Sequence, residues 1–153
     1  MDISDEMIDV ARDKYKSREN LYFSMKWPKD NFDYIFMSDV IEHLDSPKDT
    51  FLKIHKLMGE KTIFINTMAN PIWEPALMIA EKIGLKMPEG PHKRVKFEEL
   101  RFMIYESGMR IVKHSYTLLI PVNIPIITDF VNKYFEKIFR KFAFIEYFAS
   151  IKT

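Results

Sequence analysis

The stretch FDYIFMSDVIEHL at residues 32–44 decides the fold of this chain. Its first seven residues are rich in aromatic and β-branched side chains on both faces, which favours a central strand of a parallel sheet. Three side chains with chemical potential follow this strand: Asp39, Glu42 and His43. Because ligands bind outside the carboxyl ends of parallel strands, we expect the functional site at this exit.

Helical and strand-like periods alternate on either side of this stretch. A helix is predicted over 5–16, with Ser4 as its N-cap and with Met7, Ala11 and Tyr15 on one face. The other predicted elements are strands at 21–23, 61–67, 110–120 and 143–151, and helices from Pro47 to a stop at Gly59, over 71–83 before Gly84, over 97–107 before Gly108, and over 126–142. In the helix that starts at Pro47, the side chains expected to be buried are Leu52, Ile54, Leu57 and Met58.

This alternation predicts the fold class. We expect an α/β domain over 1–153, with a mostly parallel sheet, an antiparallel edge strand and helices on both faces. Within it, residues 121–142 form a lid or insertion helix.

Composition narrows the class of protein. The chain has 153 residues, of which 47% are hydrophobic and 29% charged, so it is globular. Its net charge of +1 gives no global field that would recruit nucleic acid, and no nucleic-acid partner is expected. It has no cysteine, and the acidic N-terminus is unlike a signal peptide, which favours a cytoplasmic location.

Four segments in order carry a family resemblance: Asp2–Arg12, Phe32–Leu44, Lys48–Asn66 and His92–Met109. Together they resemble class I S-adenosylmethionine-dependent methyltransferases, in particular the type 11 and ubiquinone-biosynthesis-like groups. The resemblance implies a Rossmann-like sheet, S-adenosylmethionine as cofactor, and methyl transfer to a small or lipid-like acceptor. A dehydrogenase is a rival that the same segments disfavour.

The sequence also departs from that family. Its four glycines are Gly59, Gly84, Gly90 and Gly108, and no Gly-x-Gly occurs. The family's first strand and glycine-rich loop have no counterpart before Asp2. We therefore expect an N-terminally truncated, incomplete sheet that binds the cofactor poorly, with the strand at 32–38 lacking one neighbour. The alternative function is a non-catalytic remnant of the fold or an assembly partner.

The resemblance also assigns candidate site residues. Asp2, Ile3 and Asp39 fall at cofactor-binding positions, although Asp2 could instead serve as a helix-start acid. His43 and His92 are the candidate general bases for an acceptor that must lose a proton. Some relatives hold a divalent metal at this strand exit. No metal is expected here, and the alternative ligand set is Asp39, Glu42, His43 and His92. No role is assigned to His55 or His114.

The predicted helix 126–142 is strongly amphipathic. We expect its apolar stripe to pack as core or as a lid, and the alternative is an interfacial helix in peripheral contact with an anionic membrane. Lys133, Lys137, Arg140 and Lys141 lie on the polar side. The stripe consists of Ile127, Phe130, Val131, Tyr134, Phe135, Ile138, Phe139 and Phe142.

Overall fold

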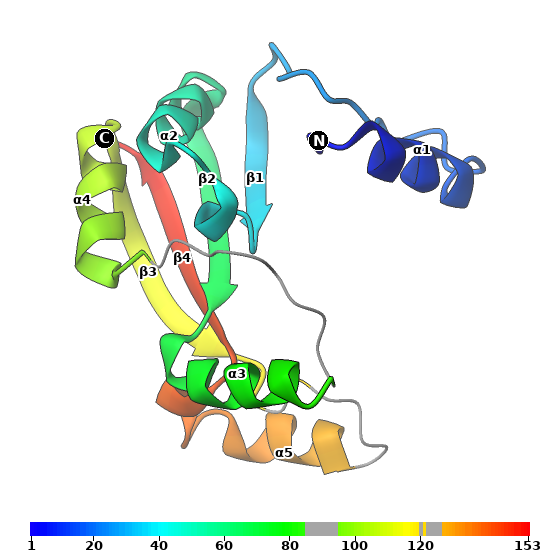
Figure 1. Cartoon of the computed structure of the whole chain (residues 1–153). Helices are drawn as coiled ribbons and strands as arrows, with labels where there is room; N and C mark the ends of the chain where they lie inside the picture. Colours follow the sequence, from blue (N-terminus) through cyan, green and yellow to red (C-terminus); the bar gives the residue numbers. More distant parts are fainter. Residues whose placement is uncertain (85–94, 120, 122–126) are drawn as a thin grey trace. The chain divides into compact units, whose positions relative to one another are not determined.

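A computed structural model describes residues 1–84, 95–119, 121 and 127–153 of the chain (Figure 1). The chain divides into two compact units, Met1–Asp30 and Asn31–Thr153. Each unit is described by itself below.

The first unit contains the helix α1, Asp5–Lys14, as predicted. The Ser4 hydroxyl accepts a hydrogen bond from the Met7 amide at 3.2 Å, which satisfies one of the free N–H groups at the helix start. The strand predicted at 21–23 is wrong, because these residues form no strand. Phe23 instead stacks on Tyr15, with ring centroids 6.1 Å apart, so this aromatic segment is used for packing within the unit.

The second unit is built on a four-stranded sheet in the order β1-β2-β4-β3. β1 and β2 are parallel, and β4 runs antiparallel to both of its neighbours. Three strands therefore share one direction, which confirms the α/β prediction, and the antiparallel β3–β4 pair closes one edge. The reversed strand β4 is second from that edge. The bounds are β1 Phe32–Ser38, β2 Met58–Ala69, β3 Met109–Thr117 and β4 Ile145–Lys152.

One face of the sheet is covered by α2 (Pro47–Lys56) and α4 (Phe97–Glu106). Pro47 stands at the first turn of α2, where its missing N–H has no helical partner to lose. Phe51 is fully buried, whereas Leu52, which was predicted to be in the core, is 39% exposed. The other three side chains predicted to be buried, Ile54, Leu57 and Met58, are buried, so the prediction fails only in choosing Leu52 over its neighbour Phe51. The largest buried side chains are Phe51, Phe64, Phe148, Ile41, Met58, Leu100, Ile104 and Met109.

The opposite face of β1 is exposed. Tyr34 and Phe36 alternate with the inward-facing Ile35 and Met37, and they are 60% and 70% exposed. Within the described sheet β1 pairs only with β2, so one side of β1 is an edge. This agrees with the expectation that the strand at 32–38 lacks a neighbour here.

The remaining helices lie near the carboxyl end of β2. Pro71–Trp73 form a short 3-10 helix and Glu74–Lys82 form α3. α5 spans Ile127–Phe135 and is followed by a 3-10 turn at Arg140–Phe142. The predicted continuous helix over 126–142 is therefore wrong, because the helix ends seven residues earlier.

Two glycines end helices as predicted. Gly84 and Gly108 have φ angles of 74° and 79°, a left-handed conformation that glycine adopts without steric penalty. Gly59 was also predicted to end a helix. It lies instead inside β2, because α2 already ends at Lys56.

Candidate functional site

The site is built on the exit of β1, where the chain turns sharply. Asp39 has a φ of 50°, an uncommon left-handed conformation for a residue with a side chain. Its amide donates a hydrogen bond to the Thr67 carbonyl of β2 at 3.1 Å, and this bond holds the turn against the neighbouring strand. The next residues form a 3-10 helix, Ile41–His43, anchored by the fully buried Ile41. This local structure directs the polar side chains that follow β1 outward.

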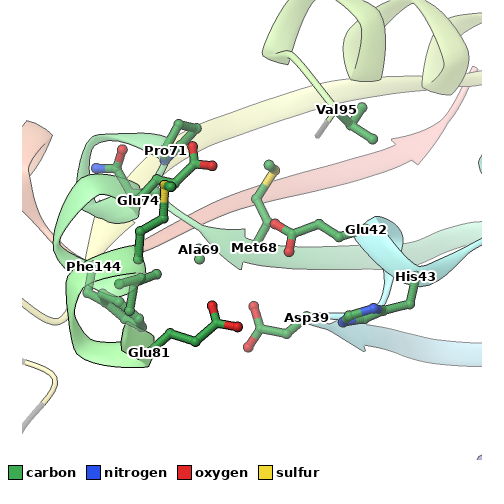
Figure 2. A pocket seen from close by; sticks show the side chains of 13 residues that line it. Asp39, Glu42, His43, Met68, Ala69, Pro71, Glu74, Glu81, Val95 and Phe144 are labelled. Carbon is green, nitrogen blue, oxygen red and sulfur yellow. The ribbon is translucent and has the colours of Figure 1, made fainter. Parts of the chain in front are cut away.

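A cavity of about 540 Å³ opens at the carboxyl ends of β1 and β2 (Figure 2). One wall is formed by the β1 exit, and the other by the end of β2 and by α3. Its volume lies within the range of about 300–1,000 Å³ that is typical of small-molecule sites. The lining residues are Asp39, Glu42, His43, Met68, Ala69, Asn70, Pro71, Glu74, Leu77, Met78, Glu81, Val95 and Phe144.

The charge of the lining is strongly one-sided. Four carboxylates line the cavity, and no lysine or arginine does so among the described residues. Figure 2 shows the Asp39 and Glu81 carboxylates directed toward each other across the opening, with the His43 ring on the Asp39 side. Carboxylates that are partly shielded from water favour a cationic ligand, because the attraction between opposite charges is stronger at low dielectric. The walls between them are apolar and include Met68 and Phe144. The cavity therefore suits a ligand with a positive group and an apolar body.

The predicted site residues are brought together only in part. Asp39, Glu42 and His43 all line the cavity, as expected for the exit of this strand. His92 and Gly90 lie outside the described residues. In the parts of the chain that the structure describes, no group of three or more His, Asp or Glu side chains is arranged to hold a metal ion.

Asp2 and Ile3 belong to the first unit. The Asp2 carboxylate accepts a hydrogen bond at 2.9 Å from the amide of Ser4, which is the N-cap of α1. The side chain of Ile3 is exposed. Their cofactor-binding role stays a prediction.

Sequence reasoning missed the wall formed by α3. Glu74, Leu77, Met78 and Glu81 line the cavity from this helix. A signal for them was available. β2 is the parallel neighbour of β1, so residues that follow its carboxyl end lie at the same edge of the sheet as Asp39.

Two further titratable clusters lie away from the cavity lining. His114 Nε2 lies 2.7 Å from Glu146 Oε1, and the ring contacts both Phe97 and Phe148 at centroid distances of 4.4 and 4.7 Å. Beside them, burial raises the pKa of Tyr116, and the charge of Glu146 and its hydrogen bond raise it further.

His55 forms the second cluster, at the end of α2. Burial lowers the pKa of His55 below its ordinary value, and the nearby charge of Lys152 adds to this effect. Neither His55 nor His114 lines the cavity, so neither is a candidate to contact a ligand there.

Comparison with known proteins links part of the chain to one family model. Residues 1–65 match the family model described as Methyltransferase domain. A search of curated proteins gives no match. Helices in the described part of the chain are too short or too polar to cross a membrane.

Solved structures show the same fold over nearly the whole chain. A Haloferax volcanii protein described as a methyltransferase, in complex with the Trm112 methyltransferase activator, is 16% identical with a TM-score of 0.68, over 99% of this chain and 70% of that one. Magnesium protoporphyrin IX methyltransferase of Synechocystis PCC 6803 with bound SAH is 15% identical with a TM-score of 0.60, over 99% of this chain and 62% of that one. An S-adenosylmethionine-dependent methyltransferase of Mesorhizobium loti is 13% identical with a TM-score of 0.64, over 99% of this chain and 78% of that one.

This chain thus spans less than two thirds of the Synechocystis enzyme. The structures of that enzyme contain SAH or SAM. Residues 1–65, less than half of the chain, thus match the methyltransferase-domain family model, and the chain shares its fold with solved S-adenosylmethionine-dependent methyltransferases.

Proposed function

We propose that the cavity beside Asp39 is the methyl-transfer site of an S-adenosylmethionine-dependent methyltransferase that acts on a small or lipid-like acceptor. The observation that carries this proposal is the position of the cavity at the carboxyl ends of two parallel strands, between the β1 exit and α3. Ligands of open α/β sheets bind at this edge.

The donor set of the cavity fits the cofactor in part. S-adenosylmethionine carries a sulfonium and an ammonium group, and the carboxylates of Asp39 and Glu81 suit such cations. A glycine-rich loop that would let the backbone approach the cofactor closely is not among the 153 residues. We therefore infer that these residues bind the cofactor weakly and supply mainly the acceptor side of the site.

The chain's own residues would position the acceptor and move a proton. When bound, the cofactor supplies a methyl group already activated by its sulfonium, so alignment is the main requirement. Met78 and Phe144 offer an apolar wall for the acceptor. His43, which lines the cavity, would take the proton from an acceptor hydroxyl or amine at an imidazole nitrogen, with His92 as the second candidate base.

The test is a titration of the 153-residue chain with S-adenosylmethionine carrying a ¹³C-labelled methyl group, followed by NMR. We expect weak binding, with a dissociation constant near or above about 1 mM, corresponding to about −4 kcal/mol. Asp39→Asn should weaken it further, whereas Asp45→Asn, an exposed acid outside the cavity lining, should not. Binding in the low micromolar range would refute the inferred weakness. Equal effects of the two substitutions would refute the placement of the site.

A second candidate function is a non-catalytic assembly partner. It is favoured by the exposed Tyr34 and Phe36 on β1, whose outer face offers apolar surface to another chain. Saturation of the labelled methyl signal that depends on Asp39 would reject this alternative. If the labelled methyl signal shows no binding at any cofactor concentration, the assembly-partner function would be supported.

A further inference from the structure

The segment from α5 to the following 3-10 turn exposes six large apolar side chains. Core or lid packing was expected for this stripe; six of its side chains are too exposed to be core residues, and the lid role stays a prediction. Their exposed fractions run from 38% at Phe135 to 72% at Ile138. We call this set the α5 aromatic surface: Phe130, Tyr134, Phe135, Ile138, Phe139 and Phe142.

Four rings of the α5 aromatic surface are in contact with one another in sequence. The ring of Phe130 lies 5.0 Å from that of Tyr134 and 6.0 Å from that of Phe135, measured between centroids. Phe135 in turn stacks on Phe139 at 6.4 Å. A contiguous exposed patch of aromatic side chains marks an interaction site more often than isolated exposed residues do.

Basic side chains accompany these rings. Lys133, Lys137, Arg140 and Lys141 lie in the same segment, and Lys133 Nζ lies 5.4 Å from the centroid of the Tyr134 ring. None of the four forms a salt bridge within the described part of the chain. These charges are therefore available to an anionic partner.

The two acidic residues of the segment do not cancel this charge. Against four basic residues stand Asp129 and Glu136, which leaves a net charge of +2. Glu136 is also engaged within the fold. Its carboxylate accepts hydrogen bonds from Thr117 Oγ1 at 3.1 Å and from the Leu118 amide at 2.9 Å.

The backbone that presents the surface is fixed to the end of β2. Asn70 Nδ2 donates to the carbonyls of Lys141 and Ala143, at 3.0 and 2.8 Å. Trp73 Nε1 donates to the Phe142 carbonyl at 2.7 Å. Because these bonds satisfy the carbonyls of residues 141–143, the turn that carries Phe142 is held in place by the fold. Phe144, two residues beyond the surface, lines the cavity.

We propose that the α5 aromatic surface binds the face of an anionic phospholipid bilayer. Aromatic side chains favour the membrane–water interface, and each nearby lysine or arginine adds attraction to anionic head groups. A second copy of the chain is a poorer occupant, since a symmetric contact would bring two sets of four basic residues together. This proposal concerns membrane contact alone and does not depend on methyl transfer.

The experiment is flotation of the full chain with vesicles of phosphatidylcholine alone, and with vesicles that contain about one third phosphatidylglycerol. We expect binding to the anionic vesicles only, weakened by salt because screening shortens the reach of surface charge. Lys137→Gln should lower the partition coefficient about fivefold, since one basic residue near the surface contributes about 1 kcal/mol. Ile138→Ser should lower it about tenfold, because the apolar contact is lost.

The matched control is Phe102→Ser, which removes a 62% exposed ring from α4 and should leave binding unchanged. Circular dichroism checks that each variant is folded, and in a Trp27→Phe background the fluorescence of Trp73, which is hydrogen-bonded to the Phe142 carbonyl, serves as a second readout of vesicle contact. Equal binding to both vesicle types would overturn the proposal, as would equal losses for Ile138→Ser and Phe102→Ser. So would a dimer that Ile138→Ser dissociates while no vesicle binds. Failure of the cofactor titration with vesicle binding intact would count only against the proposed methyl transfer.

Discussion

Gly108 allows a matched test of how closely α2 and α4 pack over the sheet. An alanine Cβ at this position would lie 3.0 Å from His55 Nε2 and 3.3 Å from His55 Cδ2. At Gly84, which has nearly the same φ, an added Cβ would meet nothing within 4 Å. The two Gly→Ala substitutions therefore share the backbone strain and differ in the contact with the His55 ring.

The magnitudes follow from these distances. Left-handed backbone costs a residue with a Cβ about 1–2 kcal/mol, and loss of glycine flexibility in the unfolded chain returns about 0.4–1 kcal/mol. Gly84→Ala should thus destabilise by about 0–1.6 kcal/mol. Gly108→Ala adds an overpacking penalty of about 1–3 kcal/mol. For a chain of this length, that difference lowers the melting temperature by roughly 2–12 °C more than Gly84→Ala does.

The assay is urea denaturation of the two variants, combined with a double-mutant cycle. His55→Ala removes the ring, so it should relieve most of the extra destabilisation of Gly108→Ala and leave Gly84→Ala unaffected. Equal stabilities of the two glycine variants would refute the reasoning. A destabilisation of Gly108→Ala that persists without the His55 ring would show that strain, not contact, is responsible.

Three further predictions concern stability. Because the pKa of His55 is lowered from 6.5 in the fold, the free energy of unfolding should fall as the pH drops below about 6.5. In His55→Gln this fall with pH should be shallower, as measured by urea denaturation at several pH values. The raised pKa of Tyr116 acts on the alkaline side: stability should fall as the pH rises above about 10, Tyr116→Phe should reduce that loss, and an unchanged alkaline melting curve would contradict the assignment. Phe51→Ala should destabilise by about 3–5 kcal/mol and Leu52→Ala by far less, as judged by thermal melting, since only the first side chain is buried. Equal losses for these two would place the buried face of α2 where the sequence pattern had it.

The sequence was most informative where local chemistry decides the structure. The N-cap Ser4, the proline at the start of α2 and the glycines after α3 and α4 are all read from short-range rules, and each stands where it was expected. The exit of β1 was also found, because a polar cluster directly after a strand needs no knowledge of the distant chain.

What failed depends on contacts between distant segments. The choice of Phe51 over Leu52 as the buried residue is set by the sheet beneath α2, which a helical period alone does not define. The amphipathic pattern of 126–142 does not reveal that the helix ends at Phe135, nor that its apolar side faces outward. The wall of the cavity formed by α3 required knowing which strand lies beside β1.

The place of β4 in the sheet has a consequence for how the protein is made. β4 is synthesised after β1, β2 and β3, yet it lies between β2 and β3 and pairs with both. Until β4 has been translated, β3 has no neighbouring strand in the sheet, and its backbone N–H and C=O groups stay unpaired. The β2–β4 pairing also joins residues roughly eighty positions apart, such as Phe64 and Ser150. Such distant pairing slows folding, so the nascent sheet depends on late threading of one strand into its middle, and this is the interval in which a chaperone would find exposed strand edges.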